Sequence, residues 1–383
     1  MNTNHVICRN KVYVEDEYVG QFESFDTQGT ARTLGNTATL LMPLYALGAD
    51  GTSGNVASRF RTENGSRIKV CSEIKVYVWY DSWNVVTMEH ESYPEILMFS
   101  GWIEHIAEGF PAKLYLRDNS YILRFGAIEK AWTENATIQS VMEDCIPIAQ
   151  AAFEEERTRL GFMREIPQLT YNLHGKNVQA KSTPLSFRNW GGRSPFDTMQ
   201  KLMQLNVLYG GVGNDFNVFI GAGVTESDRP LIALDTRYNV IERDIVPIDG
   251  RFVDYDVKVF GILKNGRQYT ATGGYRTSQS ESQKSGFDRE YGGETIRVHS
   301  TLNTIADIQG YADEQLKMLR ENRNKGTIKL LLYPKLEIMD WVTYEDTVFE
   351  NLSGGYYILD YKFSASSKGY FQTVKATDKV FVL

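Results

Sequence analysis

Residues 353–376, "SGGYYILDYKFSASSKGYFQTVKA", decide the fold class, because they predict two antiparallel strands with nothing helical after them. Side chains alternate along the first strand, which is typical of a half-buried strand. We expect one face to carry Tyr357, Leu359, Tyr361 and Phe363, and the other to carry Ile358, Asp360 and Lys362. A loop at 364–369 joins the strands. Because an isolated hairpin is only marginally stable, its apolar face requires other strands to cover it.

The composition extends this prediction to the whole chain. The 383 residues include 22 Tyr and 19 Phe, and 42% of all residues are hydrophobic. Aromatic and β-branched residues favour strands over helices. A chain of this length is typical of about two to four domains. We therefore expect a mainly β protein.

Charge and cysteine content argue against several classes of protein. A formal net charge of −7 does not suit a domain that neutralises nucleic-acid phosphates with a basic face. Cys8, Cys71 and Cys145 lie far apart without CxxC spacing, so we expect reduced thiols and no zinc site. The first residues lack an apolar signal core, and no stretch approaches the ~20 apolar residues of a membrane span. We expect a soluble protein made in the cytosol.

Residues 10–127 contain one predicted strand after another, separated by polar or Gly-containing breaks. This spacing is typical of a sandwich or barrel. One segment, Tyr45–Arg67, is polar, Gly-rich and too long for a simple turn. Loops of that length are usually functional or disordered.

The pattern becomes helical from Thr133. Thr137 is a plausible N-cap for a first helix, which Pro147 should kink or divide. Ser194 and Pro195 begin a second helix. The following "NVLYGGVGNDFNVFIGAG" predicts a hairpin with glycines at its turn. Residues 128–224 are therefore expected to form a small α/β module.

Strands return from residue 225 to the end, with a second long polar segment at Gly273–Glu294. One helix interrupts them, beginning after Thr304. Its apolar stripe is expected to be Ile305, Ile308, Ala312, Leu316 and Leu319.

The sequence shows no constellation typical of catalysis or of ligand binding. Its five His residues lack the paired spacing of a metal site. Glu104 and His105 are neighbours on a predicted strand, so their side chains point to opposite faces. The stretch "YGGVGND" lacks the Lys and Ser or Thr of a phosphate loop. Carboxylates are numerous but scattered, which leaves a glycosidase pair open. We assign no catalytic residue, cofactor or metal ligand.

Several short motifs follow one another in a fixed order. They are Asn36-Thr37-Ala38 leading to Pro43, "IKVYVWYD", "FSGWI", "KLYLRDNSYIL" and the closing Gly355-Tyr356-Tyr357-Ile358. This order resembles the tail-hub family of phage baseplates, the late control D or baseplate hub proteins, which includes the N-terminal part of the VgrG spike of type VI secretion. The strand before the closing hairpin departs from the family pattern, because "EIMDWV" keeps Asp340 and Val342 but lacks the usual Pro and Gly.

The resemblance implies two tail-tube-like β-barrels. The first is residues 1–127 and the second is residues 225–383, with a helical insertion at about 302–325 and the α/β module between the barrels. It further implies a homotrimeric structural protein that is not an enzyme. Three chains would form a ring of six barrels, which adapts a hexameric tail tube to a trimeric spike. The implied partners are the tail tube protein, a separate central spike protein and other baseplate proteins, in the tail baseplate of the virion. Neither a cofactor nor sequence-specific nucleic-acid binding is implied.

Two other functions stay open at this stage. One is a tail-associated peptidoglycan hydrolase, which would need a catalytic domain beyond the predicted parts. The other is a carbohydrate-binding β protein, which would expose aromatic side chains on loops. The six tryptophans lie mainly in or beside predicted elements, where a core role is expected. They are Trp79, Trp83, Trp102, Trp132, Trp190 and Trp341.

The two long polar segments are interpreted as interface loops ordered by neighbouring subunits or by the tail tube. Disordered surface insertions are the alternative. Charged side chains at the rim of an interface mainly affect association rate and salt dependence. The basic candidates are Arg59, Arg61, Arg276, Lys284 and Arg289.

Overall fold

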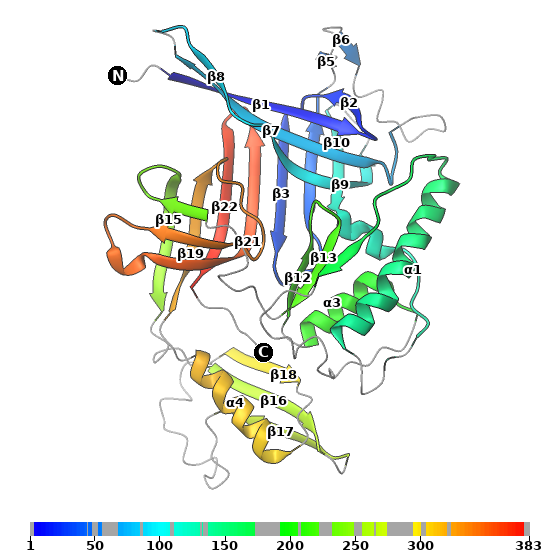
Figure 1. The fold of residues 1–383 in the computed structure, drawn as a ribbon, viewed down its shortest axis with the longest axis vertical. Coiled ribbons are helices and arrows are strands. Elements are labelled where there is room, and N and C mark those ends of the chain that lie inside the picture. Colours follow the sequence, from blue (N-terminus) through cyan, green and yellow to red (C-terminus); the bar gives the residue numbers. More distant parts are fainter. Residues whose placement is uncertain are drawn as a thin grey trace.

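The computed structural model describes sixteen stretches of the chain, and strands dominate them, as predicted. The described residues are 4–43, 45–47, 53–55, 68–84, 87–107, 111–130, 132, 137–172, 192–205, 208–221, 232–248, 255–263, 266–273, 294–299, 304–319 and 323–378. Figure 1 shows one large sheet, a pair of helices beside it, and a smaller sheet with its own helix at the end of the molecule.

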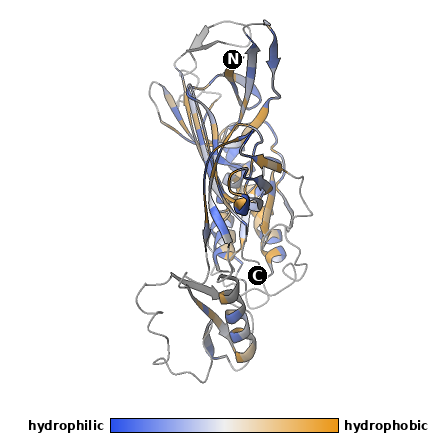
Figure 2. Ribbon diagram, turned by 90° about the vertical axis from the view of Figure 1, so that its left-hand side faces the viewer, coloured by the Kyte–Doolittle hydropathy of each residue, from blue (hydrophilic) through white to orange (hydrophobic). Residues whose placement is uncertain are grey.

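The large sheet has 14 strands within the described residues. Its main path contains β15 (Val240–Ile248), β19 (Arg323–Leu331), β22 (Gly369–Thr377), β21 (Gly354–Ser366), β3 (Ser24–Thr30), β4 (Thr37–Met42), β10 (Ala112–Asp118), β9 (Ile96–Ala107), β7 (Glu73–Asn84), β1 (Asn4–Val14) and β2 (Glu17–Gly20), in that spatial order. Three strands lie off this path: β8 (His90–Ser92) pairs with β7, β20 (Trp341–Glu345) with β21, and β14 (Ile232–Asp235) with β20. Figure 2 shows hydrophilic and hydrophobic residues alternating along these strands.

The first and last β regions share this sheet. They meet where β21 pairs antiparallel with β3, from Asp360 opposite Thr30 to Ala365 opposite Phe25. The rings of Phe25 and Phe363 lie 6.1 Å apart across this junction, and both side chains are fully buried. Regions distant in sequence therefore share one hydrophobic core.

The closing hairpin is formed by β21 and β22, as predicted, with a turn tighter than expected. Its register shifts just after Ile358, where Leu359 is the extra residue of a β-bulge. A bulge reverses the alternation of faces beyond it. The fully buried Ile358 therefore faces the same side as Tyr361 and Phe363. The predicted face is right for these last two residues and wrong for Tyr357 and Leu359.

The predicted helices of the middle region are present. Helix α1 (Ile138–Arg159) begins with a capping box, in which the Thr137 hydroxyl accepts a hydrogen bond from the Ser140 N–H at 3.1 Å. Pro147 lies inside α1 and does not divide it. The buried face of the helix continues on both sides of the proline.

The second helix, α3 (Pro195–Leu205), begins after Ser194, whose hydroxyl accepts a hydrogen bond from the Asp197 N–H. The predicted hairpin follows, as β12 (Tyr209–Val212) and β13 (Asn217–Gly221). The short strand β11 (Thr170–Asn172) pairs parallel with β13. These elements and the 3-10 helix η2 (Asn119–Arg124) enclose one hydrophobic cluster.

Helix α4 (Ile305–Leu319) belongs to a separate three-stranded sheet and lies apart from the large one (Figures 1 and 2). The strands of this sheet are β16 (Tyr255–Ile262), β17 (Gln268–Thr272) and β18 (Glu294–His299). The helix packs Ile308, Ala312 and Leu316 on it, as the predicted stripe requires. The prediction is wrong for Ile305, which is 46% exposed because it lies in the first helical turn, before the stripe reaches the sheet.

Part of the predicted polar segment Tyr45–Arg67 is regular structure, because β5 (Tyr45–Leu47) and β6 (Ser53–Asn55) form an antiparallel pair. Among the described residues, no helix combines the length and the apolar character needed to cross a membrane.

Candidate functional site

Two runs of four strands in the large sheet have the same arrangement. The run β15-β19-β22-β21 is here called the C-terminal unit. It ends on a hairpin in which β22, the later strand in the chain, comes before β21 in the sheet. The run β3-β4-β10-β9, here called the N-terminal unit, ends on the same kind of hairpin. In each unit the last strand also pairs with a further strand, β20 or β7. The two units therefore correspond strand by strand.

The hairpins carry the same irregularity. In the N-terminal unit Tyr115 lies opposite His105 and Leu116 opposite Ile103, so Glu104 is an extra residue. In the C-terminal unit the extra residue is Leu359. The two bulges occupy equivalent positions, although one residue is charged and the other apolar.

Both units contain the same pair of hydrogen bonds, here called the Asn-Asp clasp. The Asn36 N–H donates to Asp118 Oδ2 at 2.7 Å, and the Asp118 N–H donates to the Asn36 carbonyl at 3.3 Å. In the C-terminal unit the Asn324 N–H donates to Asp378 Oδ2 at 2.8 Å, and the Asp378 N–H donates to the Asn324 carbonyl at 3.1 Å. Each clasp ties the start of one strand to the end of its neighbour.

The chain also enters the flanking strand in the same way in both units. Cys71 and Met339 have positive φ angles of 67° and 65°, a conformation that few residues other than glycine adopt. The Cys71 N–H donates to the Ile103 carbonyl at 2.9 Å, and the Met339 N–H donates to the Ile358 carbonyl at 2.7 Å. Shared clasps, bulges and backbone conformations identify the two units as structural repeats.

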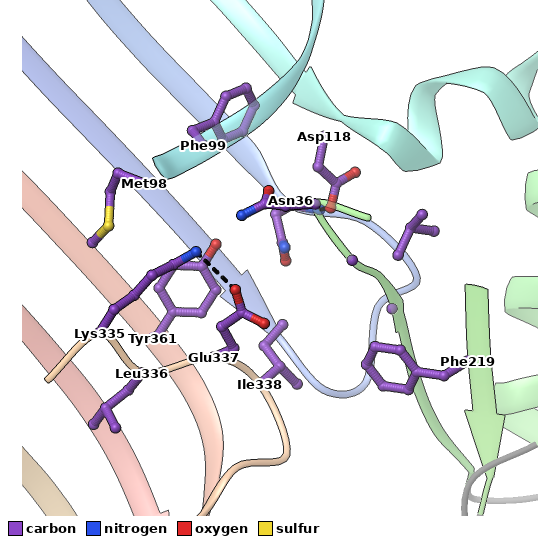
Figure 3. Close-up of a pocket in the computed structure, with 14 residues that line it drawn as sticks. Asn36, Met98, Phe99, Asp118, Phe219, Lys335, Leu336, Glu337, Ile338 and Tyr361 are labelled. Atoms are coloured by element: carbon purple, nitrogen blue, oxygen red, sulfur yellow. Dashed lines mark hydrogen bonds and ion pairs between the residues drawn. The ribbon is translucent and has the colours of Figure 1, made fainter. Parts of the chain in front are cut away.

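A cavity of about 70 Å³ lies where the N-terminal unit meets the β12–β13 hairpin and residues 335–338. Figure 3 shows Asn36 and Asp118 on one side of it, and Tyr361 with the paired Lys335 and Glu337 on the other. Small-molecule sites usually measure about 300–1,000 Å³. This volume suits a few water molecules, not an organic substrate.

Asp118 is the buried charge at this junction. Burial raises the pKa of its carboxyl to about 6, against hydrogen bonds from Ser120 and from the Asn36 N–H that favour the ionised form. The Ser120 N–H donates to Oδ1 at 3.0 Å, and the Ser120 hydroxyl also donates to Oδ1. Gly101 lies directly opposite Asp118, where a Cβ atom would collide with the backbone of β10.

An ion pair fixes α1 to the N-terminal unit. Arg157 is 2% exposed, and its two terminal nitrogens donate to the two oxygens of Glu15 at 2.9 and 3.0 Å. One nitrogen also donates to the Cys71 carbonyl at 2.6 Å. Such a bidentate pair orients both groups. The α/β module is thereby held against the turn between β1 and β2.

The two units leave two unpaired edges at their outer ends. β15 pairs only with β19 in the described part of the chain. β9 pairs with β7 no further than Trp102, so beyond Ile103 its second edge has no described partner strand. On β15 the apolar side chains Ile241 and Val246 are 47% and 52% exposed. An exposed apolar strand edge is a template for pairing with another chain.

The candidate interface residues from the sequence, Arg59, Arg61, Arg276, Lys284 and Arg289, lie outside the described residues. Sequence reasoning missed the clasps. A signal was present in the equivalent strands β10 and β22. β10 ends in Asp118, in "KLYLRD", and β22 is followed directly by Asp378, in "TVKATD".

Other residues singled out in the sequence have structural environments. Glu104 forms an ion pair with Arg117 at 2.7 Å, and His105 packs against Tyr115, so these neighbours do not converge. All three cysteines are free thiols. The described residues hold no cluster of three or more His, Cys, Asp or Glu suited to a metal ion.

The tryptophan prediction is right in part. Trp79, Trp102 and Trp132 are buried and Trp341 is half-buried, whereas Trp83, near the end of β7, is 37% exposed. Trp190 lies outside the described residues.

No protein-family model matches the sequence, and no curated protein matches it. Solved structures do match. The chain is similar to a tail protein from Neisseria meningitidis MC58, with 13% identity, 98% of each chain covered and a TM-score of 0.58. It is also similar to the 43 kDa tail protein of prophage MuSo2 from Shewanella oneidensis, with 12% identity, coverage of 96% of this chain and 97% of that chain, and a TM-score of 0.51. A prophage tail protein from Listeria monocytogenes EGD-e matches at 12% identity, 96% and 94% coverage and a TM-score of 0.50. The chain therefore has the fold of these phage tail proteins over nearly its whole length, as the resemblance predicted.

Proposed function

We propose that the chain is a structural hub protein of a phage tail baseplate, forming a homotrimeric ring that adapts a hexameric tail tube to a trimeric spike. The observation that carries the proposal is the repeated four-stranded unit. Three chains with two equivalent units each present six similar surfaces around an axis, while the true symmetry stays threefold. Such a ring meets a sixfold partner on one side and a threefold partner on the other. The shared fold with phage tail proteins supports this role.

The proposed ring divides each chain into three parts. Residues 1–127 and 225–383 provide the two tube-like regions, and 128–224 provide the module between them. The Asn-Asp clasps and the two bulges support the equivalence of the tube-like regions. The partners proposed are the tail tube protein, a central spike protein and other baseplate proteins, in the virion.

The trimer is tested by native mass spectrometry of the purified chain. The expected particle has about 131 kDa, three times the 43.6 kDa of one chain. Electron microscopy of the same sample should show a ring. A chain that stays monomeric up to high concentration, with no ring, would refute the proposal.

A non-enzymatic role is part of the proposal, supported by the small size of the junction cavity. A zymogram on purified peptidoglycan distinguishes this role from that of a tail-associated hydrolase. Clearing that disappears when a single carboxylate or cysteine is replaced would favour the hydrolase. Specific retention on a glycan array would instead favour the carbohydrate-binding protein.

The segments Tyr45–Arg67 and Gly273–Glu294 are proposed as interface loops. Each one belongs to a different β region, so a trimer would carry six such segments around its axis. Replacing each segment with a short Gly-Ser linker should weaken trimers or their attachment to the tail, as seen by electron microscopy. If both replacements leave assembly intact, the segments are surface insertions.

A further inference from the structure

We propose that β9 of one subunit pairs antiparallel with β15 of the next copy of the chain, in the register that β21 and β3 use inside the chain. The proposal rests on the proposed ring and names the strands that close it. It follows from the repeat, because the molecule already contains one junction between two units.

The internal junction joins the last strand of the C-terminal unit to the first strand of the N-terminal unit. Lys362 lies opposite Gln28 and Tyr361 lies opposite Gly29 in this pairing. The complementary edges of the same two units, on β15 and β9, have no described partner strand. Each unpaired edge is therefore equivalent to an edge that is already paired elsewhere in the chain.

The bulges set the correspondence between β21 and β9. Leu359 and Glu104 are the equivalent extra residues. Counting onward from them, Lys362 corresponds to Ala107. The edge that β21 presents to β3 therefore corresponds to the end of β9, beyond its pairing with β7.

The clasps set the correspondence between β3 and β15. Asn36 and Asn324 are equivalent, so the next residues, Thr37 and Lys325, are also equivalent. Thr37 lies opposite Gln28.

Lys325 in turn lies opposite Val246, so Gln28 corresponds to Val246 and Gly29 to Pro247. Carrying the internal register over to the open edges places Ala107 opposite Val246 of the partner subunit, and Ile106 opposite Pro247 of the partner subunit.

The exposed side chains of β15 fit this occupant. Val246 is 52% exposed on a strand edge, and the same position in the N-terminal unit, Gln28, is flanked by β21. Pro247 has no N–H to donate, so the proposed pairing lacks one ladder hydrogen bond at Ile106, and the same proline makes this edge a poor template for unrelated strands. The β15 edge thus has an apolar surface to cover and a device against indiscriminate pairing.

A competing edge exists on β1, because in the described part of the chain β2 pairs only with the last residues of β1, from Val12 to Val14. Val6 on this strand is 59% exposed. β1 belongs to neither unit, and the repeat gives it no equivalent junction. The β1 edge therefore provides a control, since β15 should not pair with it.

Disulfide cross-linking of the full-length protein tests the register. In a Cys8→Ser background, Ala107→Cys with Val246→Cys should link neighbouring chains on oxidation, giving covalent dimers and closed trimers on a non-reducing gel. Gln28→Cys with Lys362→Cys is the matched positive control, because these residues are opposite one another inside the chain and should give an internal disulfide in a monomer. Val6→Cys with Val246→Cys is the control for the competing edge.

Peptide mass spectrometry should identify the 107–246 link in most chains and the 6–246 link in almost none. A trimer by native mass spectrometry that shows no 107–246 link, while the 28–362 control closes, would overturn this junction and leave the proposed ring standing. Efficient 6–246 linking would overturn it in favour of β1. A protein that forms no trimer would refute both this proposal and the proposed function.

Discussion

Protonation of Asp118 should make the stability of the protein depend on pH in a way that one substitution removes. Its carboxyl is 3% exposed, and burial raises its pKa from an ordinary value of 3.8 to about 6. The folded state therefore holds the Asp118 proton more tightly than the unfolded state does. The stability from this group is fully present below about pH 4 and is lost as pH rises through about 6.

The magnitude follows from the size of the pKa difference. A shift of one pKa unit corresponds to about 1.4 kcal/mol, so the full effect of Asp118 is about 3 kcal/mol, of which about 2.4 kcal/mol should be lost between pH 4 and pH 7.5. Asp118→Asn keeps the shape of the side chain and cannot ionise. The wild type should therefore lose about 2.4 kcal/mol more than this variant over the same pH range.

Urea unfolding followed by tryptophan fluorescence, at several pH values, measures this difference. Other titrating groups cancel when the wild type is compared with Asp118→Asn at each pH. Asp378→Asn breaks the equivalent clasp in the C-terminal unit and controls for the lost hydrogen bond. A difference between wild type and Asp118→Asn that does not change with pH would refute the argument that Asp118 is held protonated near pH 6.

Three further predictions concern stability and can be checked by the same unfolding measurement. Ile358→Ala should cost about 2–5 kcal/mol because it empties a fully buried site, whereas Leu359→Ala at the bulge should cost less than about 1.5 kcal/mol; equal costs would mean that the bulge is misplaced. Gly355→Ala should destabilise the protein by about 1–3 kcal/mol, because the added Cβ would collide with the ring of Trp341. The added Cβ of Gly310→Ala in α4 meets no atom, so this change should stabilise the protein by up to about 1 kcal/mol. Arg157→Ala should cost about 3–5 kcal/mol, since it leaves Glu15 without its buried bidentate partner. A cost below about 1 kcal/mol would show that this ion pair does not hold the α/β module.

The strands and helices of this protein could largely be predicted from the sequence, because each has a local signal. Alternation marks β21, and the Thr137 and Ser194 side chains mark the starts of α1 and α3. The face of β21 could not be predicted throughout, because a bulge has no strong signature in the residues around Leu359. Its equivalent, Glu104, differs in polarity, so the bulge depends on backbone pairing more than on side-chain type.

The repeat could not be predicted either, because equivalent positions in the two units share backbone conformation more than residue type. Equivalent positions hold Cys71 and Met339, which share a backbone conformation and little chemistry. The clasps keep both identity and role, because Asn36 and Asn324 are equivalent, as are Asp118 and Asp378. Which strand edges remain open depends on how all strands pair, and no local pattern in the sequence records that.

A cryo-electron microscopy map of the assembled protein, calculated without imposed symmetry, would show the proposed ring itself. We expect three chains around one axis and six four-stranded units in one continuous wall, alternating between the C-terminal and N-terminal units. A ring with another number of units, or one in which the two units of a chain lie at different distances from the axis, would contradict it.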